Sequence, residues 1–137
     1  MPGHPIPPEF PLTEFVGQEV TQVCIGLGQV QLFFYKQPQT GSPDKWRPGA
    51  RIDVESAFSL EEAASIMYRV EQSDFRRTGG RLTNLLGATV EGVRVESGNE
   101  FQLLFSGGLA LLLHTDQQGF ESYHLHVGGE SATVTRA

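Results

Sequence analysis

The chain of 137 residues has little that would cross-link it, anchor it in a membrane or draw it to nucleic acid. A single cysteine, Cys24, excludes a disulfide within the chain, and its apolar neighbours at 23–25 predict a small buried side chain. Ten Lys and Arg residues against sixteen Asp and Glu residues give a net charge of −6, which argues against a duplex-binding domain. The longest apolar run, residues 109–113, is too short to span a bilayer, and the N-terminus does not resemble a signal peptide. We therefore expect a cytoplasmic protein without nucleic-acid or membrane partners.

The composition is rich in turn-forming residues, with 16 glycines and 8 prolines, which favours short strands. Five of the eight prolines fall within residues 1–12, so this segment is expected to form an extended or frayed N-terminal arm. The remaining residues, 13–137, have the length of a single β-rich domain.

An internal repeat is the strongest sign of organisation. Residues 15–25 align with residues 85–95 at an offset of 70, and one inserted residue then aligns 31–34 with 102–105. Seven positions are identical: Gly17/Gly87, Val20/Val90, Val23/Val93, Gly28/Gly98, Gln31/Gln102, Leu32/Leu103 and Phe34/Phe105. We therefore expect two pseudo-repeats, at about residues 15–70 and 85–135.

Alternation of apolar and polar residues predicts strands in both repeats, three in each. Residues 52–60 have apolar side chains at every second position except Ser56 and are expected to form one long strand. Residues 109–113 are expected to form a central strand. The glycines of Ser106-Gly107-Gly108 supply the positive φ of a tight hairpin. The fold class is therefore mainly β, with two antiparallel meanders forming a sandwich or a small barrel and at most one or two short helices.

The segment 57–86 allows two interpretations. Ser59 and Glu62 fit a capping box, which would begin a helix over 60–71. The apolar residues at 66, 68 and 70 fit instead a strand that pairs with the preceding one, and we favour this hairpin. Residues 80–86 are expected to form a helical turn before the second repeat.

Two histidines near the C-terminus form the sharpest chemical pattern. His124 and His126 are two apart on a predicted strand, so both imidazoles lie on one face, and Glu130 follows four residues later. His114, at the end of the central strand, is a further candidate ligand. The run 124–130 resembles the first metal-binding motif of the cupins, and this resemblance implies a small β-barrel that holds a divalent metal. The alternative, favoured by the buried face that Tyr123 and its alternate neighbours predict, is that the histidines are polar residues on a solvated face.

A broader resemblance covers about residues 13–127. The Gly-x-x-Val-x-x-Val pattern that begins at Gly17, the residues FSGGL at 105–109 and the segment Phe120-Glu121-Ser122-Tyr123 resemble a family of small uncharacterised bacterial β-rich proteins. The resemblance implies a bacterial, cytoplasmic protein and assigns no catalytic residue. Phe120, Glu121 and Tyr123 then mark either a structural corner, which we favour, or a binding edge.

Three functions remain open. We favour a non-enzymatic interaction or binding module, self-associating or bound to a cationic partner, as immunity proteins bind toxin domains, because the net charge is −6. The second function is a small-ligand-binding protein that uses the mouth of the barrel or the groove between the repeats, with the loop 37–49 and its Trp46 as a lid. The third is a metal-dependent enzyme using His124, His126 and Glu130; no other cofactor is expected.

Overall fold

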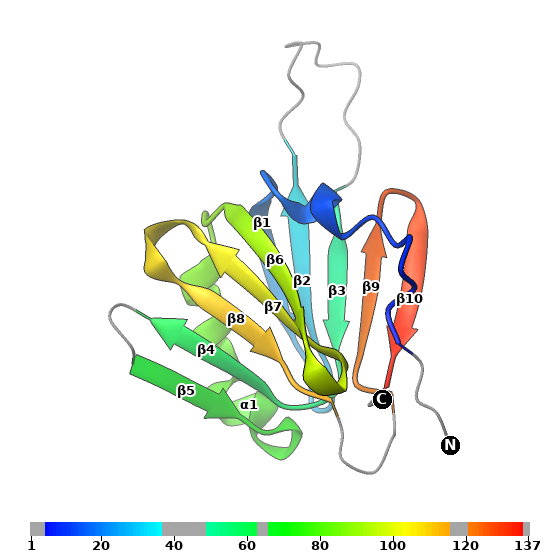
Figure 1. Cartoon of the computed structure of the whole chain (residues 1–137). Helices are drawn as coiled ribbons and strands as arrows, with labels where there is room; N and C mark the ends of the chain where they lie inside the picture. The colour runs from blue at the N-terminus through cyan, green and yellow to red at the C-terminus, as the bar shows by residue number, and fades with distance from the viewer. Residues whose placement is uncertain (1–4, 37–48, 63–65, 116–120, 136–137) are drawn as a thin grey trace.

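A computed structural model describes residues 5–36, 49–62, 66–115 and 121–135. The chain is mainly β, as the sequence predicts, and it forms a sandwich of two antiparallel five-stranded sheets rather than a barrel (Figure 1). Sheet A contains, in spatial order, β1 (Glu19–Ile25), β2 (Val30–Tyr35), β3 (Arg51–Val54), β9 (Tyr123–Val127) and β10 (Glu130–Val134). Sheet B contains β5 (Ile66–Val70), β4 (Phe58–Glu62), β8 (Ala110–Leu113), β7 (Glu100–Phe105) and β6 (Val90–Glu96).

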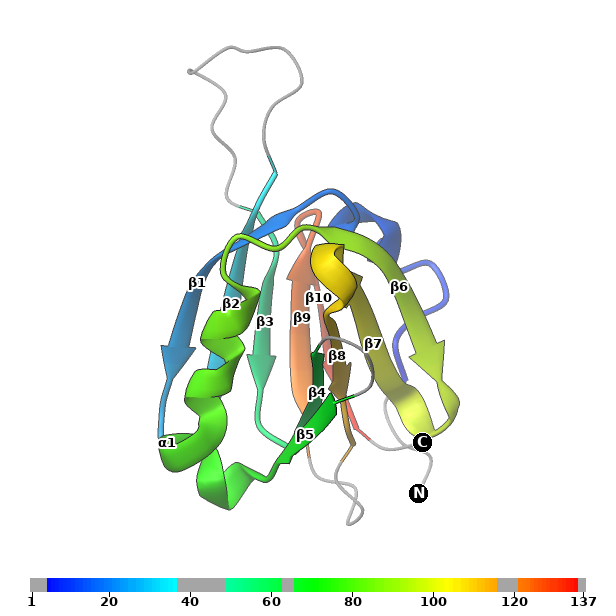
Figure 2. The same ribbon diagram turned by 90° about the vertical axis from the view of Figure 1, so that its left-hand side faces the viewer.

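Short helical segments pack at the sides of the sandwich or connect neighbouring strands. They are η1 (Leu12–Phe15), η3 (Gln72–Asp74), α1 (Phe75–Thr78), η4 (Gly79–Leu85), η5 (Ser97–Asn99) and η6 (Ser106–Gly108). The run from η3 to η4 passes between β5 and β1 (Figure 2), and η1 contacts β6 and β9 on the other side. Within the described ranges, no helix has the length and apolarity needed to cross a membrane.

The two repeats exchange strands between the sheets. Sheet A takes β1, β2 and β3 from the first repeat and β9 and β10 from the second, whereas sheet B takes β6, β7 and β8 from the second repeat and β4 and β5 from the first. Each repeat therefore supplies five strands, not the three expected from the sequence. The chain crosses from one sheet to the other between β3 and β4 and again between β8 and β9.

The arrangement is symmetric about a pseudo-two-fold axis near Glu19 and Thr89. These residues are 70 apart and align with each other in the repeat, and they form an antiparallel bridge. Around the bridge the hydrogen bonds are reciprocal: the amide of Gly17 donates to the carbonyl of Val90 (2.8 Å), and the amide of Gly87 donates to the carbonyl of Val20 (2.9 Å). Both glycines have positive φ, 88° and 85°.

The strand predictions are correct in part. The favoured hairpin is confirmed, since β4 pairs with β5, and η4 confirms the helical turn before the second repeat. Gly107 and Gly108 both have φ of 78°, as the tight turn requires. The long strand over 52–60 is wrong: β3 and β4 belong to different sheets, and the period of two arises because both strands face the same core.

The core lies between the sheets and is rich in aromatic rings. Phe15 of η1 packs on Phe34 of sheet A and Phe101 of sheet B, with ring centroids 5.7 and 5.8 Å apart. On the opposite side Phe75 of α1 packs on Phe58, at 5.8 Å. The helical segments thus contribute rings to the same core that the strands enclose.

Two peripheral predictions concern the N-terminal arm and Cys24. Phe10 of the proline-rich arm is buried in the core and Ile6 and Leu12 pack against it, whereas the other described residues of the arm are partly or fully exposed; residues 1–4 lie outside the described range. Cys24 is only half-buried and is paired with Gln31, whereas Val23 faces the core opposite Leu32. The prediction of a core cysteine is therefore wrong.

Candidate metal centre

The outer face of sheet A carries a cluster of polar side chains. In β9 the alternation predicted from the sequence holds: Tyr123, Leu125 and Val127 are buried, and the two histidines between them face outward. Because β9 pairs with β3, His124 lies opposite Asp53 and His126 lies opposite Arg51. The strand exchange thus places histidines of the second repeat beside carboxylates of the first.

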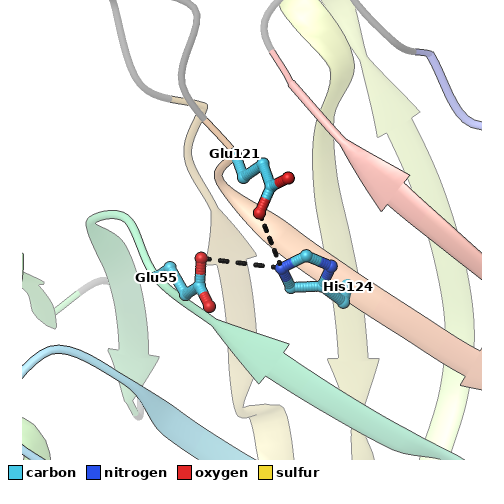
Figure 3. Close-up of side chains that lie close together, drawn as sticks. All are labelled: Glu55, Glu121 and His124. Atoms are coloured by element: carbon cyan, nitrogen blue, oxygen red, sulfur yellow. Dashed lines mark ion pairs between the residues drawn. The ribbon is translucent and has the colours of Figure 1, made fainter.

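His124 meets two carboxylates at the end of sheet A where β3 stops and β9 starts (Figure 3). Its Nε2 atom lies 3.5 Å from Oε2 of Glu55, the residue that follows β3, and 3.7 Å from Oε2 of Glu121, which precedes β9. One ligand atom from each of the three residues lies within 4.8 Å of the other two. His124 and Glu55 are half-buried and Glu121 is exposed, so the cluster opens to solvent.

Neighbouring side chains hold the His124 imidazole and the Glu55 carboxylate through the atoms that do not face the cluster. The Nδ1 atom of His124 is 2.9 Å from Oγ1 of Thr133 on β10. Gln29, just before β2, donates from Nε2 to Oε1 of Glu55 at 3.1 Å. The imidazole is therefore fixed at Nδ1 and the carboxylate at Oε1, which leaves Nε2 and Oε2 turned toward each other. Metal-binding histidines are commonly held in this way through their second ring nitrogen.

The spacing of these atoms suits a small divalent cation better than direct hydrogen bonds. Distances of 3.5 and 3.7 Å exceed the ordinary length of a charged N–H···O bond, about 2.7–2.9 Å. Ligands about 2.1 Å from a tetrahedral Zn²⁺ lie about 3.4 Å from one another. One imidazole and two carboxylates form a donor set for Zn²⁺, Mn²⁺ or Fe²⁺. These residues fit a three-ligand site with at least one position open to water.

His126 is engaged in a different network. Its Nε2 atom lies 3.2 Å from Oδ2 of Asp53 and 3.1 Å from Nη2 of Arg51, and its Nδ1 atom lies 2.9 Å from Oγ of Ser131. Asp53 is buried and also accepts a hydrogen bond from Nε2 of Gln31 (3.0 Å). With a guanidinium beside the ring, His126 is poorly placed to bind a cation. This network joins β2, β3, β9 and β10.

The other predicted ligands lie elsewhere. Glu130 is exposed at the start of the edge strand β10, where it lines a hollow of about 300 Å³ with Pro7, Glu9, Phe10 and Ser131. His114 follows β8 in sheet B and contacts Glu100 and Ser59. Of the four residues proposed from the sequence as metal ligands, the structure brings only His124 into the cluster, together with Glu121, which was proposed as a binding residue.

Tyr123, one of the three residues proposed as a corner or a binding edge, belongs to the core. Its side chain is fully buried, stacks on Phe101, and donates a hydrogen bond to the backbone carbonyl of Asn99 (2.5 Å). Burial, with a smaller contribution from the charge of Glu100, raises the pKa of the Tyr123 phenol well above its usual range. Trp46 and Phe120 lie outside the described residues.

A second hollow lies on sheet A and shares no residue with the cluster. Its volume is about 380 Å³ and it is lined by Thr21, Gln22, Phe33, Phe34, Tyr35, Gly49 and Ala50. These residues lie on β1, β2 and the chain just before β3. None of the described residues that line this hollow is a histidine or a carboxylate.

Glu55 is the ligand that sequence reasoning missed. It is 69 residues from His124, and only the pairing of β3 with β9 brings the two together. The available signal was weak: a carboxylate directly after an apolar strand, at a point where the chain leaves a sheet. The polar residues Gln29 and Thr133, which fix the cluster, have no distinguishing pattern in the sequence.

No protein-family model matches this chain, and neither the curated proteins nor the solved structures include a match to it.

Proposed function

We propose that this protein is a binding module whose ligand is a divalent transition-metal ion, held by His124, Glu55 and Glu121. The observation that carries the proposal is the position of Nε2 of His124, which faces one oxygen of each carboxylate at 3.5 and 3.7 Å while Nδ1 is fixed by Thr133. A cation between these atoms would replace two long charge contacts by direct coordination.

Zn²⁺ and Mn²⁺ are the ions that this donor set favours under physiological supply, since one nitrogen and two oxygens lack the thiolates that select copper(I). The exposure of Glu121 leaves room for water or an anionic group of a bound molecule at the open position. Binding is expected to weaken at low pH, because protons compete with the metal for the imidazole and the carboxylates.

The test is a titration of untagged, metal-free protein with Zn²⁺ and Mn²⁺ by isothermal calorimetry. We expect one ion per chain in the wild type and at least about tenfold weaker binding in His124→Gln. The matched control is His126→Gln, which changes a histidine on the same strand and face that contacts Arg51 and Asp53 instead. Equal affinity in His124→Gln and the wild type, or an equal loss in the control, would refute this site.

A further inference from the structure

Sheet B carries a serine, a histidine and a glutamate in a linear hydrogen-bonded array. The Oγ atom of Ser59, on β4, lies 2.7 Å from Nε2 of His114, and Nδ1 of His114 lies 2.8 Å from Oε2 of Glu100, on β7. The His114 side chain is 11% exposed and that of Glu100 is 31% exposed. Since Phe58, Leu60 and Phe101 point into the core, Ser59 and Glu100 project from the outer face of sheet B.

The chemistry of the three groups fixes the direction of the hydrogen bonds. An ionised carboxylate only accepts hydrogen bonds, so Nδ1 of His114 carries the proton that Glu100 receives. The lone pair of Nε2 then accepts the hydrogen bond of the Ser59 hydroxyl. A serine that donates to a histidine, which in turn donates to a carboxylate, is the arrangement of an activated nucleophile, its general base and the group that orients the base.

Two residues of the array occupy positions equivalent to two metal-cluster residues, Glu55 and His124, and the third is equivalent to Gln29, which contacts Glu55. The pairing of β2 with β3 and of β7 with β8 makes Gln29 equivalent to Glu100 and Glu55 equivalent to His114. In the same way, the pairing of β9 with β3 and of β4 with β8 makes His124 equivalent to Ser59. Gln29, Glu55 and His124 also contact one another in that order. The pseudo-two-fold axis thus relates two polar corners that carry different chemistry.

The surroundings of Ser59 define a substrate class. Leu112 lies directly opposite it on β8, and Leu104 and Met67, both exposed, project from the same face of sheet B. Arg69, opposite Ser59 on β5, has its Nε on Oε1 of Glu71 at 2.7 Å, which holds its guanidinium on this face. Apolar side chains on the same face as the hydroxyl suit a small ester with an apolar acyl group, and the Arg69 guanidinium can donate to the carbonyl oxygen that becomes negative during attack.

We propose that Ser59 is a nucleophile toward small apolar acyl esters, with His114 as its general base and Glu100 as the residue that positions His114. The Oγ atom forms a bond to the acyl carbon, and its proton passes to Nε2 of His114. The ester C–O bond then breaks, and the leaving alkoxide takes the proton from Nε2, which leaves the acyl group on Ser59. Water then gives a proton to Nε2 of His114 and its oxygen bonds to the acyl carbon. The bond between this carbon and Oγ breaks, and Oγ takes the proton back from Nε2, which releases the acid and restores the serine.

The burial of Ser59 limits access to its hydroxyl. Ser59 is only 4% exposed, so a substrate reaches Oγ when the side chains beside it move apart. We expect Leu112→Ala to accelerate the reaction, because the substitution opens the side of Ser59 that faces β8 without removing any group of the array.

The experiment is covalent labelling of the full chain with a fluorophosphonate probe, followed by mass spectrometry of the peptides. Reaction forms a bond between Ser59 Oγ and phosphorus, expels fluoride and passes the proton to His114. We expect labelling at Ser59 in the native protein, none after denaturation, and none in Ser59→Ala. Ser131→Ala is the matched control: this serine also contacts a histidine, but Arg51 shares that ring, and its loss is expected to leave labelling unchanged.

Three further variants, at Glu100 and His114, keep the proposal falsifiable if Ser59→Ala folds poorly. Glu100→Gln is expected to slow labelling at least about tenfold, and Glu100→Asp is expected to restore part of the rate, whereas a purely structural role would leave labelling of folded protein unchanged. Failure of the native wild type to react with the probe, or unchanged labelling in folded His114→Ala, would overturn the proposal. Neither outcome bears on the metal site, whose ligands lie in sheet A.

Discussion

Replacing Tyr123 by phenylalanine is expected to lower the free energy of unfolding at neutral pH and to leave it equal to that of the wild type near pH 11. The phenol is fully buried and donates to the carbonyl of Asn99, so Tyr123→Phe leaves that carbonyl without its donor. A lost hydrogen bond of this kind lowers the free energy of unfolding by about 1.5 kcal/mol. The substitution leaves the other hydrogen bond of Asn99, from its Nδ2 to the carbonyl of Thr135, in place.

The pH dependence follows from the raised pKa of the Tyr123 phenol in the folded state, which burial causes. Because the folded pKa lies above the unfolded value, the neutral phenol contributes its full stability below about pH 10, and this stability is lost as the pH rises further. At pH 11 ionisation in the unfolded chain favours unfolding of the wild type by about 1.4 kcal/mol, whereas phenylalanine does not ionise. The two proteins should then be about equally stable.

Urea unfolding followed by far-ultraviolet circular dichroism at pH 7, 9, 10 and 11 measures this difference without interference from phenolate absorption. The gap between wild type and Tyr123→Phe should be constant from pH 7 to 9 and then close. A gap that stays constant to pH 11 would refute the reasoning, because it would mean that the phenol ionises alike in the folded and unfolded states.

Three other perturbations have expected outcomes. Gly49→Ala places a Cβ atom 1.9 Å from the carbonyl oxygen of Phe34, so it should lower the free energy of unfolding by at least about 3 kcal/mol. Gly28→Ala, whose Cβ atom would have its nearest neighbour at 3.6 Å, should lower it by under about 1 kcal/mol. Urea titration of both variants measures the difference. Asp53→Ala removes the acceptor of three side chains in sheet A and should lower the free energy of unfolding by about 1–3 kcal/mol without abolishing metal binding, measured by denaturation and calorimetry. Zn²⁺ at 100 times its dissociation constant should raise the unfolding free energy of the wild type by about 2.7 kcal/mol and leave His124→Gln unchanged when thermal unfolding is compared with and without a chelator.

Local features of the fold were predictable from the sequence because they depend on neighbouring residues. The alternation in β9 correctly oriented Tyr123 and His124, and the paired glycines at 107–108 correctly placed a turn. The error at Cys24 also has a local cause. A β-bulge between Val20 and Gln22 shifts the alternation by one residue, so Val23 faces the core and Cys24 faces outward.

The spacing of valines in the sequence indicates this bulge. The spacing of three between Val20 and Val23 recurs between Val90 and Val93, and β6 has its own bulge between Val90 and Gly92. A spacing of three on a strand puts both side chains on one face only if an extra residue intervenes. Reading the spacing in this way would have placed Cys24 on the outer face.

The candidate metal site could not be predicted from local sequence patterns. Glu55 and His124 meet because β9 of the second repeat pairs with β3 of the first, and no alternation pattern reports which strands become neighbours. Sequence-based grouping of His124 with His126 assumed that ligands on one strand act together, whereas cross-strand neighbours on β3 give the two histidines separate partners. The expectation of a cationic protein partner depends on net charge alone and stays a prediction.

The exchange of strands between the repeats has a consequence for how such a chain can originate and fold. One repeat alone has three strands of one sheet and two of the other, so it completes neither sheet and leaves both apolar faces exposed to water. Such a unit reaches this architecture only as an obligate homodimer, whose folding is a bimolecular reaction with a concentration-dependent stability. Joining two copies through the segment that contains α1 makes the same association unimolecular. It also allows the two halves to differ in sequence, so that one corner has the carboxylates and histidine of the metal cluster while the equivalent corner has Ser59.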